Sequence, residues 1–327
     1  MRAFVTGGTG FLGTHLIQEL DVNGWEIIAL HRTKSDLTEL KKCRDVKFVL
    51  GDVTDIESIR RGMPETVDAV FHCAGSVGNL PHSQEKSRYL INQTGTQNVV
   101  EVSKEKTIGR LIYTTTVLTY DFHACRPLTE NAPRNLWCRD AYIHSKLLAD
   151  EEVEKGSKAG LDVVFLHPSA LFGAYDKDTW SKMFREIKRG LPTPFGPPGG
   201  FSACDARPVA QAHLAAFHKG KRGSHYILGG PDVTLLEVLQ EVAKLLGKKG
   251  PTIKLPSPLF KTYGWSEFLV SSLIKREPML TPHTIGILCE SIYSDSSRAI
   301  EELGYKSTKL HEMLSDCYHW LVKNNLL

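Results

Sequence analysis

The segment AYIHSKLLADE places a tyrosine and a lysine, Tyr142 and Lys146, four residues apart. On a helix this spacing puts the two side chains on one face. A free tyrosine, with a pKa of about 10, is a poor proton donor at neutral pH. A neighbouring ammonium group stabilises the phenolate and lowers that pKa, so the pair is a candidate general acid for carbonyl reduction. The spacing alone is common, and two ordinary surface residues would also match it.

A run of three threonines, Thr114 to Thr116, is a candidate second part of the same site. It follows the apolar stretch RLIY, which has the pattern of a buried strand. A hydroxyl group at the end of this strand could hydrogen-bond the oxygen of a substrate carbonyl group. Because β-branched threonines also simply finish strands, the run favours a site only in combination with Tyr142 and Lys146.

The opening stretch MRAFVTGGTGFLG indicates which element would position this chemistry. Three glycines, Gly7, Gly10 and Gly13, separate an apolar run over Arg2 to Gly7 from an amphipathic pattern over Thr14 to Leu20. In a strand–turn–helix unit the first glycine permits a tight turn, the second lets the backbone approach a pyrophosphate, and the third lets helix and strand pack closely. Backbone N–H groups at the start of the helix then bind the phosphates. The stretch therefore predicts a dinucleotide site.

The residues after the second expected strand, Trp25 to Leu30, indicate which dinucleotide binds. In NAD-binding versions of this unit an acidic residue ends the strand and accepts hydrogen bonds from the ribose 2′-hydroxyl group. Here Arg32 stands nineteen residues after Gly13, and Lys34 follows it. Since a cation suits a 2′-phosphate, the sequence favours NADPH over NADH, although Arg32 could also be an ordinary surface charge.

Strand and helix patterns alternate along the first part of the chain. Further strands are expected within residues 46–55, 67–75, 110–116 and 161–173, and a helix is expected over Gly95 to Glu105. This alternation predicts an α/β fold with a Rossmann-type doubly wound parallel sheet and helices on both faces. Ligands bind such sheets at the carboxyl ends of the strands, so residues that follow a strand are the candidates for function.

Taken together, these parts resemble the extended short-chain dehydrogenase/reductase family over nearly the whole chain. The resemblance rests on the order and spacing of the glycine turn after Thr6, Asp52-Val53, HCAG at 72–75, NQTGTQNVV from Asn92, the threonine run, Tyr142 with Lys146, HPSALFG at 167–173 and YILGG at 226–230. It implies a smaller C-terminal substrate-binding domain beside the Rossmann-type sheet. We expect the cofactor domain over residues 1–171, with a returning segment at about 204–230, and the substrate-binding domain over 172–203 and 231–327.

The resemblance also implies roles for individual residues. It makes Tyr142 the proton donor, and Lys146 the residue that holds the nicotinamide ribose and tunes Tyr142. Thr116, where the family usually has serine, would orient the carbonyl group, and Asn92 would be a positioning residue in contact with the cofactor. The other expected cofactor contacts are Thr6, Gly7, Gly10, Phe11, Leu12, Gly13, Arg32, Lys34, Asp52, Val53, Ala74, Gly75, Thr114, Thr115, Pro168, Ser169 and Leu171.

A departure from the family's pattern indicates a branch within it. Sugar-nucleotide epimerases resemble one another in a motif whose arginine grips the nucleotide diphosphate. Here FSACDARPVAQAH stands in its place, with Phe201 near the arginine position and Arg207-Pro208 instead of an acidic pair. Together with Arg32, this favours the branch resembling dihydroflavonol reductases and related aldehyde and ketone reductases, whose substrates are less polar. Arg207 could still hold an acidic group of a substrate.

The expected substrate contacts are mostly aromatic, because aromatic side chains favour flat or apolar ligands. They are Ser76, Val77, Tyr120, Phe172, Tyr175, Trp180 and Phe201, with Trp137 and Trp265 as further aromatic candidates. Each of these aromatic residues could equally well be part of the core.

The sequence therefore predicts NADPH-dependent reduction of a small, largely apolar or aromatic aldehyde or ketone to an alcohol. Hydride would pass from the nicotinamide to the carbonyl carbon while Tyr142 protonates the developing alkoxide. Three alternatives stay open: a sugar-nucleotide epimerase or dehydratase, a 3β-hydroxysteroid-type dehydrogenase working in the oxidative direction, and a non-catalytic regulator that senses NADP. The last often lacks the tyrosine or the lysine, and this chain keeps both.

Composition and charge argue against other classes of protein. The net charge of +3 is too small and too evenly spread to favour nucleic acid. Seven singly scattered cysteines and thirteen dispersed histidines predict reduced thiols, a cytoplasmic location and no metal site. We expect neither a signal peptide nor an integral membrane segment. Residues 258–274, interrupted by Lys261 and Glu267, are interpreted as a core or pocket helix rather than a surface anchor. A monomer and a homodimer both stay open.

Overall fold

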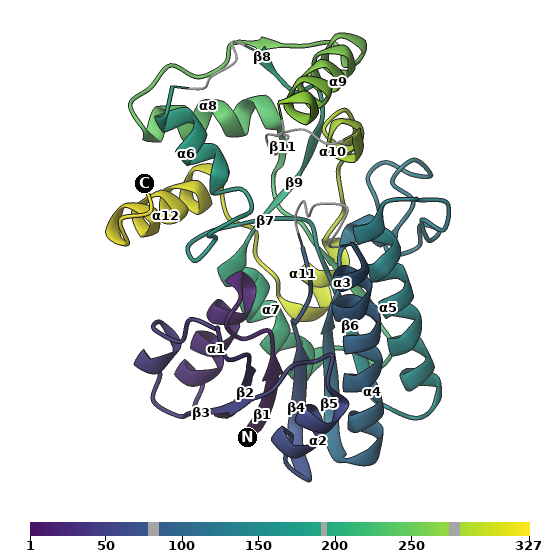
Figure 1. Cartoon of the computed structure of the whole chain (residues 1–327). Coiled ribbons are helices and arrows are strands. Elements are labelled where there is room, and N and C mark those ends of the chain that lie inside the picture. Colours follow the sequence, from purple (N-terminus) through teal and green to yellow (C-terminus); the bar gives the residue numbers. More distant parts are fainter. Residues whose placement is uncertain (78–84, 191–194, 275–281) are drawn as a thin grey trace.

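The computed structural model describes residues 1–77, 85–190, 195–274 and 282–327 of the chain. Its centre is a parallel seven-stranded sheet in the order β10-β6-β5-β4-β1-β2-β3 (Figure 1). The strands are β1 (Arg2–Thr6), β2 (Glu26–His31), β3 (Val46–Leu50), β4 (Thr66–His72), β5 (Thr107–Thr114), β6 (Val163–Pro168) and β10 (His225–Leu228). The predicted doubly wound parallel sheet is therefore confirmed. Its strand order reverses between β1 and β4, which is where such sheets bind ligands.

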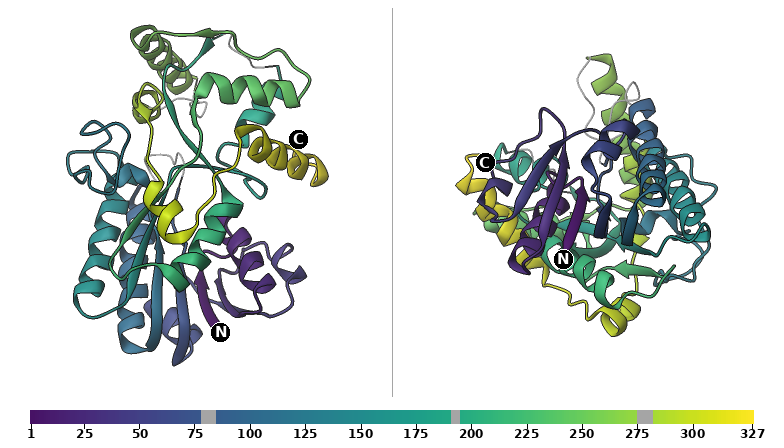
Figure 2. Two further views of the ribbon diagram at one scale, coloured as in Figure 1. Left: turned by 180° about the vertical axis from the view of Figure 1, so that it is seen from behind. Right: turned by 90° about the horizontal axis from the view of Figure 1, so that it is seen from below.

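Helices cover both faces of this sheet. One face packs against α1 (Phe11–Val22), α7 (Ala206–Lys219) and α11 (Ser297–Leu303), and the other against α2 (Ile56–Gly62), α4 (Gly95–Glu105) and α5 (Ala141–Lys158). Figure 2 shows α7 and α11 in front of the sheet when the molecule is seen from behind. The apolar stripe expected on the first helix, Leu16, Ile17 and Leu20, is fully buried against the sheet. Burial of such stripes is the main force that holds the helices in place.

A smaller layer lies beyond the carboxyl ends of the main strands (Figure 1). A four-stranded sheet there comprises β7 (Ala170–Phe172), β9 (Gly200–Asp205), β11 (Asp232–Thr234) and β13 (Ser291–Ile292), and a core is shared with α6 (Lys182–Lys188), α8 (Leu235–Leu245) and α12 (Leu310–Lys323). At the far end lie the paired strands β8 (Phe195–Gly196) and β12 (Ile253–Lys254), followed by α9 (Ser257–Leu273) and α10 (Pro282–Ile287). Residues 191–194 and 275–281 of this part lie outside the described residues.

The structure corrects one expectation about this layer. Residues 258–274 were interpreted as a core or pocket helix, but α9 leaves most of its large apolar side chains exposed, with Leu273 at 82%. Apolar composition alone led to the wrong interpretation, because it indicates burial without indicating what covers the helix. No helix within the described residues is long and apolar enough to cross a bilayer.

Arg110 on β5 joins the main sheet to the returning segment. Its guanidinium donates hydrogen bonds to the carbonyl oxygens of Ala216 (3.0 Å), Phe217 (2.8 Å) and Gly220 (2.8 Å) at the end of α7. It also forms an ion pair of 2.7 Å with Asp162. The last carbonyl groups of a helix have no partner within the helix, so one largely buried side chain satisfies groups that would otherwise be left without a bond.

We expect Arg110→Met to lower the free energy of unfolding by about 2 to 3 kcal/mol, because it leaves buried acceptors without donors. The matched control is Arg2→Met, which removes an exposed ion pair with Glu26 on a neighbouring strand and should cost less than about 1 kcal/mol. Denaturant unfolding of both variants measures the difference. Equal losses in the two variants would contradict this role for Arg110.

Candidate active site

The glycine turn between β1 and α1 brings segments of backbone closer together than side chains would allow. Gly7 has a φ of 73°, and a Cβ atom there would lie 2.5 Å from the backbone nitrogen of Ala74. A Cβ on Gly13 would lie 2.1 Å from the carbonyl oxygen of Gly7. Gly10, which has no side chain, is the N-cap of α1, so the first backbone N–H groups of the helix remain available to an anion. This cradle fits the diphosphate of a dinucleotide.

Thr6 and Asn92 brace the strand ends beside this turn. The Thr6 hydroxyl lies 2.6 Å from His72 Nδ1, and burial lowers the pKa of that histidine to about 3. Asn92, in a π-helical turn over Leu90–Thr94, accepts a hydrogen bond from the Ser76 backbone nitrogen (2.6 Å). Its amide nitrogen donates to the Ser145 hydroxyl (2.9 Å) on α5. Asn92 therefore ties the loop after β4 to the helix that carries Tyr142 and Lys146.

Tyr142 meets Thr116 just beyond the carboxyl end of β5. The Asp140 carboxylate caps α5 by accepting a hydrogen bond from the Ile143 backbone nitrogen (2.9 Å), and the first turn presents Tyr142 towards the Thr116 hydroxyl. Burial raises the pKa of Tyr142 to about 12; the Thr116 hydroxyl and the positive charge of Arg88, 5.6 Å from the ring centre, oppose that rise. Tyr142 is thus protonated at neutral pH, as a proton donor must be. Its pKa is raised and not lowered as the sequence predicted, because the cost of burying the phenolate outweighs the nearby positive charge.

Lys146 lies one helical turn further along α5, buried beneath this site. Its ammonium group donates a hydrogen bond to the Thr114 carbonyl oxygen (2.9 Å) and lies 4.7 Å from the centre of the Tyr113 ring. Burial lowers the pKa of Lys146 to about 8, and the negative charge of Asp150 opposes the fall. Lys146 is therefore mostly a cation at neutral pH and loses its charge as the pH rises through about 8.

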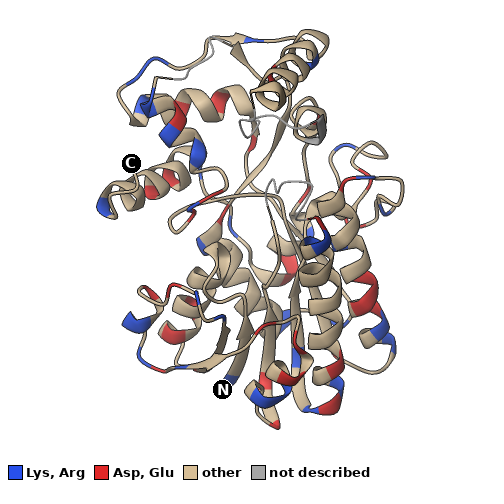
Figure 3. Cartoon of the chain, in the orientation of Figure 1, with Lys and Arg blue, Asp and Glu red and all other residues tan. Residues whose placement is uncertain are grey.

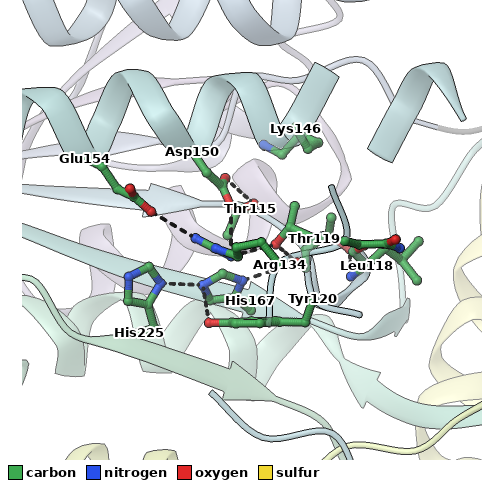
Figure 4. Close-up of polar contacts among 12 residues, drawn as sticks. Thr115, Leu118, Thr119, Tyr120, Arg134, Lys146, Asp150, Glu154, His167 and His225 are labelled. Atoms are coloured by element: carbon green, nitrogen blue, oxygen red, sulfur yellow. Dashed lines mark hydrogen bonds and ion pairs between the residues drawn. The ribbon is translucent and has the colours of Figure 1, made fainter. Parts of the chain in front are cut away.

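A network that we did not predict from the sequence supports Lys146 from behind (Figure 4). Asp150, one turn after Lys146, accepts a hydrogen bond from the Thr115 hydroxyl (2.6 Å) and lies 3.3 Å from Arg134 Nη1. Arg134 also reaches Glu154 at 3.3 Å. Burial raises the pKa of Asp150, while Arg134 and then Lys146 lower it. The four-residue spacing from Lys146 is a signal for Asp150, whereas nothing in the sequence around Arg134 indicates its role.

Tyr120, an expected substrate contact, lies in the core under this network. It is 2% exposed and packs with Val117 and Ile227. Arg134 lies 4.8 Å from the centre of its ring, and its hydroxyl group lies 3.4 Å from His167 Nε2. The Tyr120 side chain is therefore fully engaged within the protein.

The loop after β2 folds against the glycine turn. The Thr9 hydroxyl donates to the Ser35 hydroxyl (3.4 Å), which in turn accepts from the Arg32 backbone nitrogen (3.1 Å). The side chains of Arg32 and Lys34 are exposed, and within the part of the chain that the structure describes neither takes part in an ion pair. Both cations are thus free to meet a ligand at this edge.

The other expected cofactor contacts follow strand ends or begin α1. Asp52 accepts hydrogen bonds from Thr54, and Val53 packs against Gly95. Thr114 contacts Cys73 and His213, and Thr115 is turned towards Asp150. Phe11 and Leu12 are half-buried in the first turn of α1, and Gly75 lies beside Asn92. Pro168, Ser169 and Leu171 lie at the end of β6 and the start of β7.

The expected aromatic substrate contacts separate into three groups. Phe172, Trp180 and Phe201 stack on one another at 5.1 to 5.9 Å, with Phe172 in the core and the other two half-buried. Tyr175 instead faces α1 and α12, where its hydroxyl accepts a hydrogen bond from Gln18 and its ring contacts Trp320. Trp137 and Trp265 are exposed, as is Val77, whereas Ser76 is held by Asn92.

Arg207, the other candidate for substrate binding, is already engaged. It forms ion pairs with Asp205 (2.6 Å) and Asp316 (2.5 Å) and lines a surface hollow beside His15 on α1. Among the described residues, no group of three or more His, Cys, Asp or Glu side chains could hold a metal ion.

A parallel sheet with a glycine turn at its switch point, and a Tyr-x-x-x-Lys helix beside it, define a short-chain dehydrogenase/reductase type of protein. The sequence pattern of the NAD dependent epimerase/dehydratase family matches residues 3–229, and the chain belongs to this family. The expected resemblance to extended short-chain dehydrogenases/reductases is thereby confirmed.

Individual relatives agree with this assignment. A Synechocystis protein provisionally named dihydroflavonol 4-reductase is 28% identical, over 97% of this chain and 93% of its own. The yeast Saccharomyces cerevisiae protein named sterol-4-alpha-carboxylate 3-dehydrogenase, decarboxylating, is also 28% identical, over 92% of each chain. The crystal structure of gox2253 superposes with a TM-score of 0.84 at 23% identity, over 98% of both chains. That structural likeness shows a shared fold.

We expect Asp150→Asn to move the alkaline limb of the pH–activity profile to lower pH by about one pH unit. The cationic form of Lys146, whose pKa is about 8, is lost as pH rises, and the Asp150 carboxylate raises that pKa. Without the carboxylate, Lys146 should therefore lose its positive charge at a lower pH. The quantity to measure is kcat/KM against pH with the cofactor and substrate that the protein turns over.

Glu154→Gln is the matched control, because Glu154 binds the same Arg134 but lies near the surface. Its alkaline limb should stay in place. An unshifted limb in Asp150→Asn, or the same shift in both variants, would show that Asp150 does not act through Lys146.

Proposed function

We propose that this protein is an NADPH-dependent reductase that converts a small, largely apolar or aromatic aldehyde or ketone to an alcohol. The arrangement that carries this proposal is Tyr142 facing the Thr116 hydroxyl, with Lys146 beneath it, next to the glycine turn. Family membership supports the nicotinamide cofactor, and the name of the Synechocystis relative supports the reductase branch.

The roles of the side chains follow from their protonation states. The Thr116 hydroxyl orients the substrate carbonyl oxygen, and Tyr142, protonated at neutral pH, gives its proton to that oxygen as negative charge develops on it. The Lys146 ammonium stabilises the phenolate that remains. The glycine turn and the start of α1 would hold the NADPH diphosphate, and the bound cofactor supplies the hydride.

The proposal extends to the division into domains, the class of substrate and the location of the protein. We assign residues 1–171 and about 204–230 to cofactor binding, and residues 172–203 and 231–327 to substrate binding. The half-buried Trp180 and Phe201 favour an apolar or flat substrate, and Arg207, already paired with two carboxylates, is poorly placed to grip a diphosphate. Seven free cysteines agree with a cytoplasmic location.

A second candidate is oxidation of a hydroxysteroid, running the same chemistry in reverse. The yeast relative named as a sterol-4-alpha-carboxylate 3-dehydrogenase favours it. The two proposals differ in direction: Tyr142 is held in its protonated form, which reduction uses, whereas oxidation requires the phenolate as a base. Assays of purified protein with NADPH and carbonyl compounds, and with NADP⁺ or NAD⁺ and 3β-hydroxysteroids, distinguish them.

We expect Tyr142→Phe to lower kcat by about a thousandfold, because it removes the proton donor and leaves cofactor binding intact. The measurement is NADPH oxidation over a panel of aromatic, aliphatic and steroid carbonyl compounds, with cofactor affinity measured separately. Tyr318→Phe on α12, where the half-buried ring packs against the core of the smaller layer, should behave as the unchanged protein. A Tyr142→Phe protein with undiminished turnover would overturn the proposal.

We expect Arg32→Gln to lower the preference for NADPH over NADH by about 10 to 100-fold. The change removes a charge-assisted hydrogen bond to the 2′-phosphate, worth roughly 1.5 to 3 kcal/mol. The ratio of kcat/KM for the two cofactors reports it. Arg44→Gln, at an exposed arginine that pairs with Asp21, is the control; an unchanged ratio in Arg32→Gln would show that Arg32 is only a surface charge.

A further inference from the structure

The outer face of α9 is a large, uncharged apolar surface. Its exposed apolar side chains are Leu259, Tyr263, Trp265, Leu269, Val270 and Leu273, with Ile274 directly after the helix, and they are between 42% and 82% exposed. At 100° per residue these positions fall within one half of the helix circumference. The other three residues of this face, Pro258, Thr262 and Ser266, are also uncharged. Soluble proteins rarely leave such a surface open without a use for it.

The packing of α9 fixes this face outward. Its opposite side, with Phe260, Gly264 and Ser271, is buried. A Cβ atom on Gly264 would lie 2.6 Å from Ile285 Cγ1, so α9 sits tightly against α10. Figures 1 and 2 show α9 at the end of the molecule farthest from the amino ends of the main strands, with α10 beside it. The apolar face therefore belongs to the tip of a packed domain.

Basic residues precede this face in the sequence and flank it at Lys254 and Lys261. Between residues 242 and 274 the sequence has five lysines and one acidic residue, Glu267. The lysines, all exposed, are Lys244, Lys248, Lys249, Lys254 and Lys261. Glu267 is half-buried and accepts a hydrogen bond from Ser271 (2.8 Å). Figure 3 shows the positive charges along the loop that leads from α8 through β12 into α9, and on α9 itself.

We propose that this tip binds the surface of an anionic lipid bilayer, with the apolar face of α9 lying in the interfacial layer and the lysines against the lipid headgroups. Apolar burial and attraction to anionic lipids together drive such binding. Trp265 and Tyr263 are the residue types that favour the membrane–water interface. A second copy of the chain is a poorer partner, because a symmetric interface would bring two sets of lysines together.

This proposal does not rest on the proposed enzymatic function. The face contains none of the residues assigned to the cofactor or to catalysis, so lipid binding can be measured without turnover. An inactive protein that binds vesicles, and an active one that does not, are distinguishable results.

The test is co-sedimentation of the full-length protein with vesicles of phosphatidylcholine, with and without phosphatidylserine. We expect binding to the anionic vesicles that weakens several-fold at high salt. The double variant Leu269→Glu/Leu273→Glu should reduce the partition coefficient at least about tenfold. Val22→Glu, at an exposed apolar residue of α1 (75%), is the matched control and should bind as the unchanged protein does.

Two further measurements keep the test decisive if the double variant folds poorly. Lys248→Gln/Lys249→Gln/Lys254→Gln should also lose about tenfold in binding to anionic vesicles. Tryptophan emission should shift to shorter wavelength on binding, and Trp265→Phe but not Trp137→Phe should abolish that shift. Failure to bind anionic vesicles, or binding insensitive to these changes, overturns the proposal. A concentration-dependent dimer that Leu269→Glu/Leu273→Glu dissociates, without vesicle binding, would instead assign the face to a second copy.

Discussion

The buried ammonium group of Lys146 needs polar partners, and the residues around it supply them. Removing a charge from water is costly unless partners replace the lost hydration. The Thr114 carbonyl oxygen and the face of the Tyr113 ring supply part of that replacement. The Asp150 carboxylate supplies the opposite charge, but it is buried as well and needs partners of its own, Thr115 and Arg134. One lysine thus accounts for the polar residues at the end of β5 and along the inner side of α5.

Burial also drives the pKa values of Tyr142 and Lys146 apart. Burial disfavours the charged form of each, so it raises the pKa of Tyr142 to about 12 and lowers that of Lys146 to about 8. The tyrosine keeps its proton while the lysine is close to losing its own. Two groups whose environments drive their pKa values in opposite directions are a common basis for acid–base catalysis. The Asp150 carboxylate opposes the fall in the pKa of Lys146. The network of Asp150, Thr115 and Arg134 therefore influences the pH at which the site loses its cation.

The sequence predicted the parts that depend on short spacings and lost accuracy where distant segments meet. The glycine turn and the Tyr142–Lys146 pair each lie within one local element, so their geometry follows from residue spacing alone. Arg134 lies in a loop, and its contact with Asp150 depends on how that loop crosses α5. Tyr120 and Phe172 were expected at the substrate site but lie in the core, because aromatic character favours burial without distinguishing a pocket from a core. Arg32 lies exposed at the expected edge, in the loop that folds against the glycine turn.

The candidate active site and α9 reverse the usual distribution of residues in opposite senses. Beneath the candidate active site, charged side chains are buried, and each has a partner within the chain. At α9, large apolar side chains are exposed, and their packing against α10 leaves no room for the helix to turn them inward. A buried charge without partners would destabilise the fold, so its compensation must be internal. An exposed apolar face carries no such requirement within the monomer, so a partner outside the chain can cover it, and Lys254 and Lys261 beside it favour a negatively charged one.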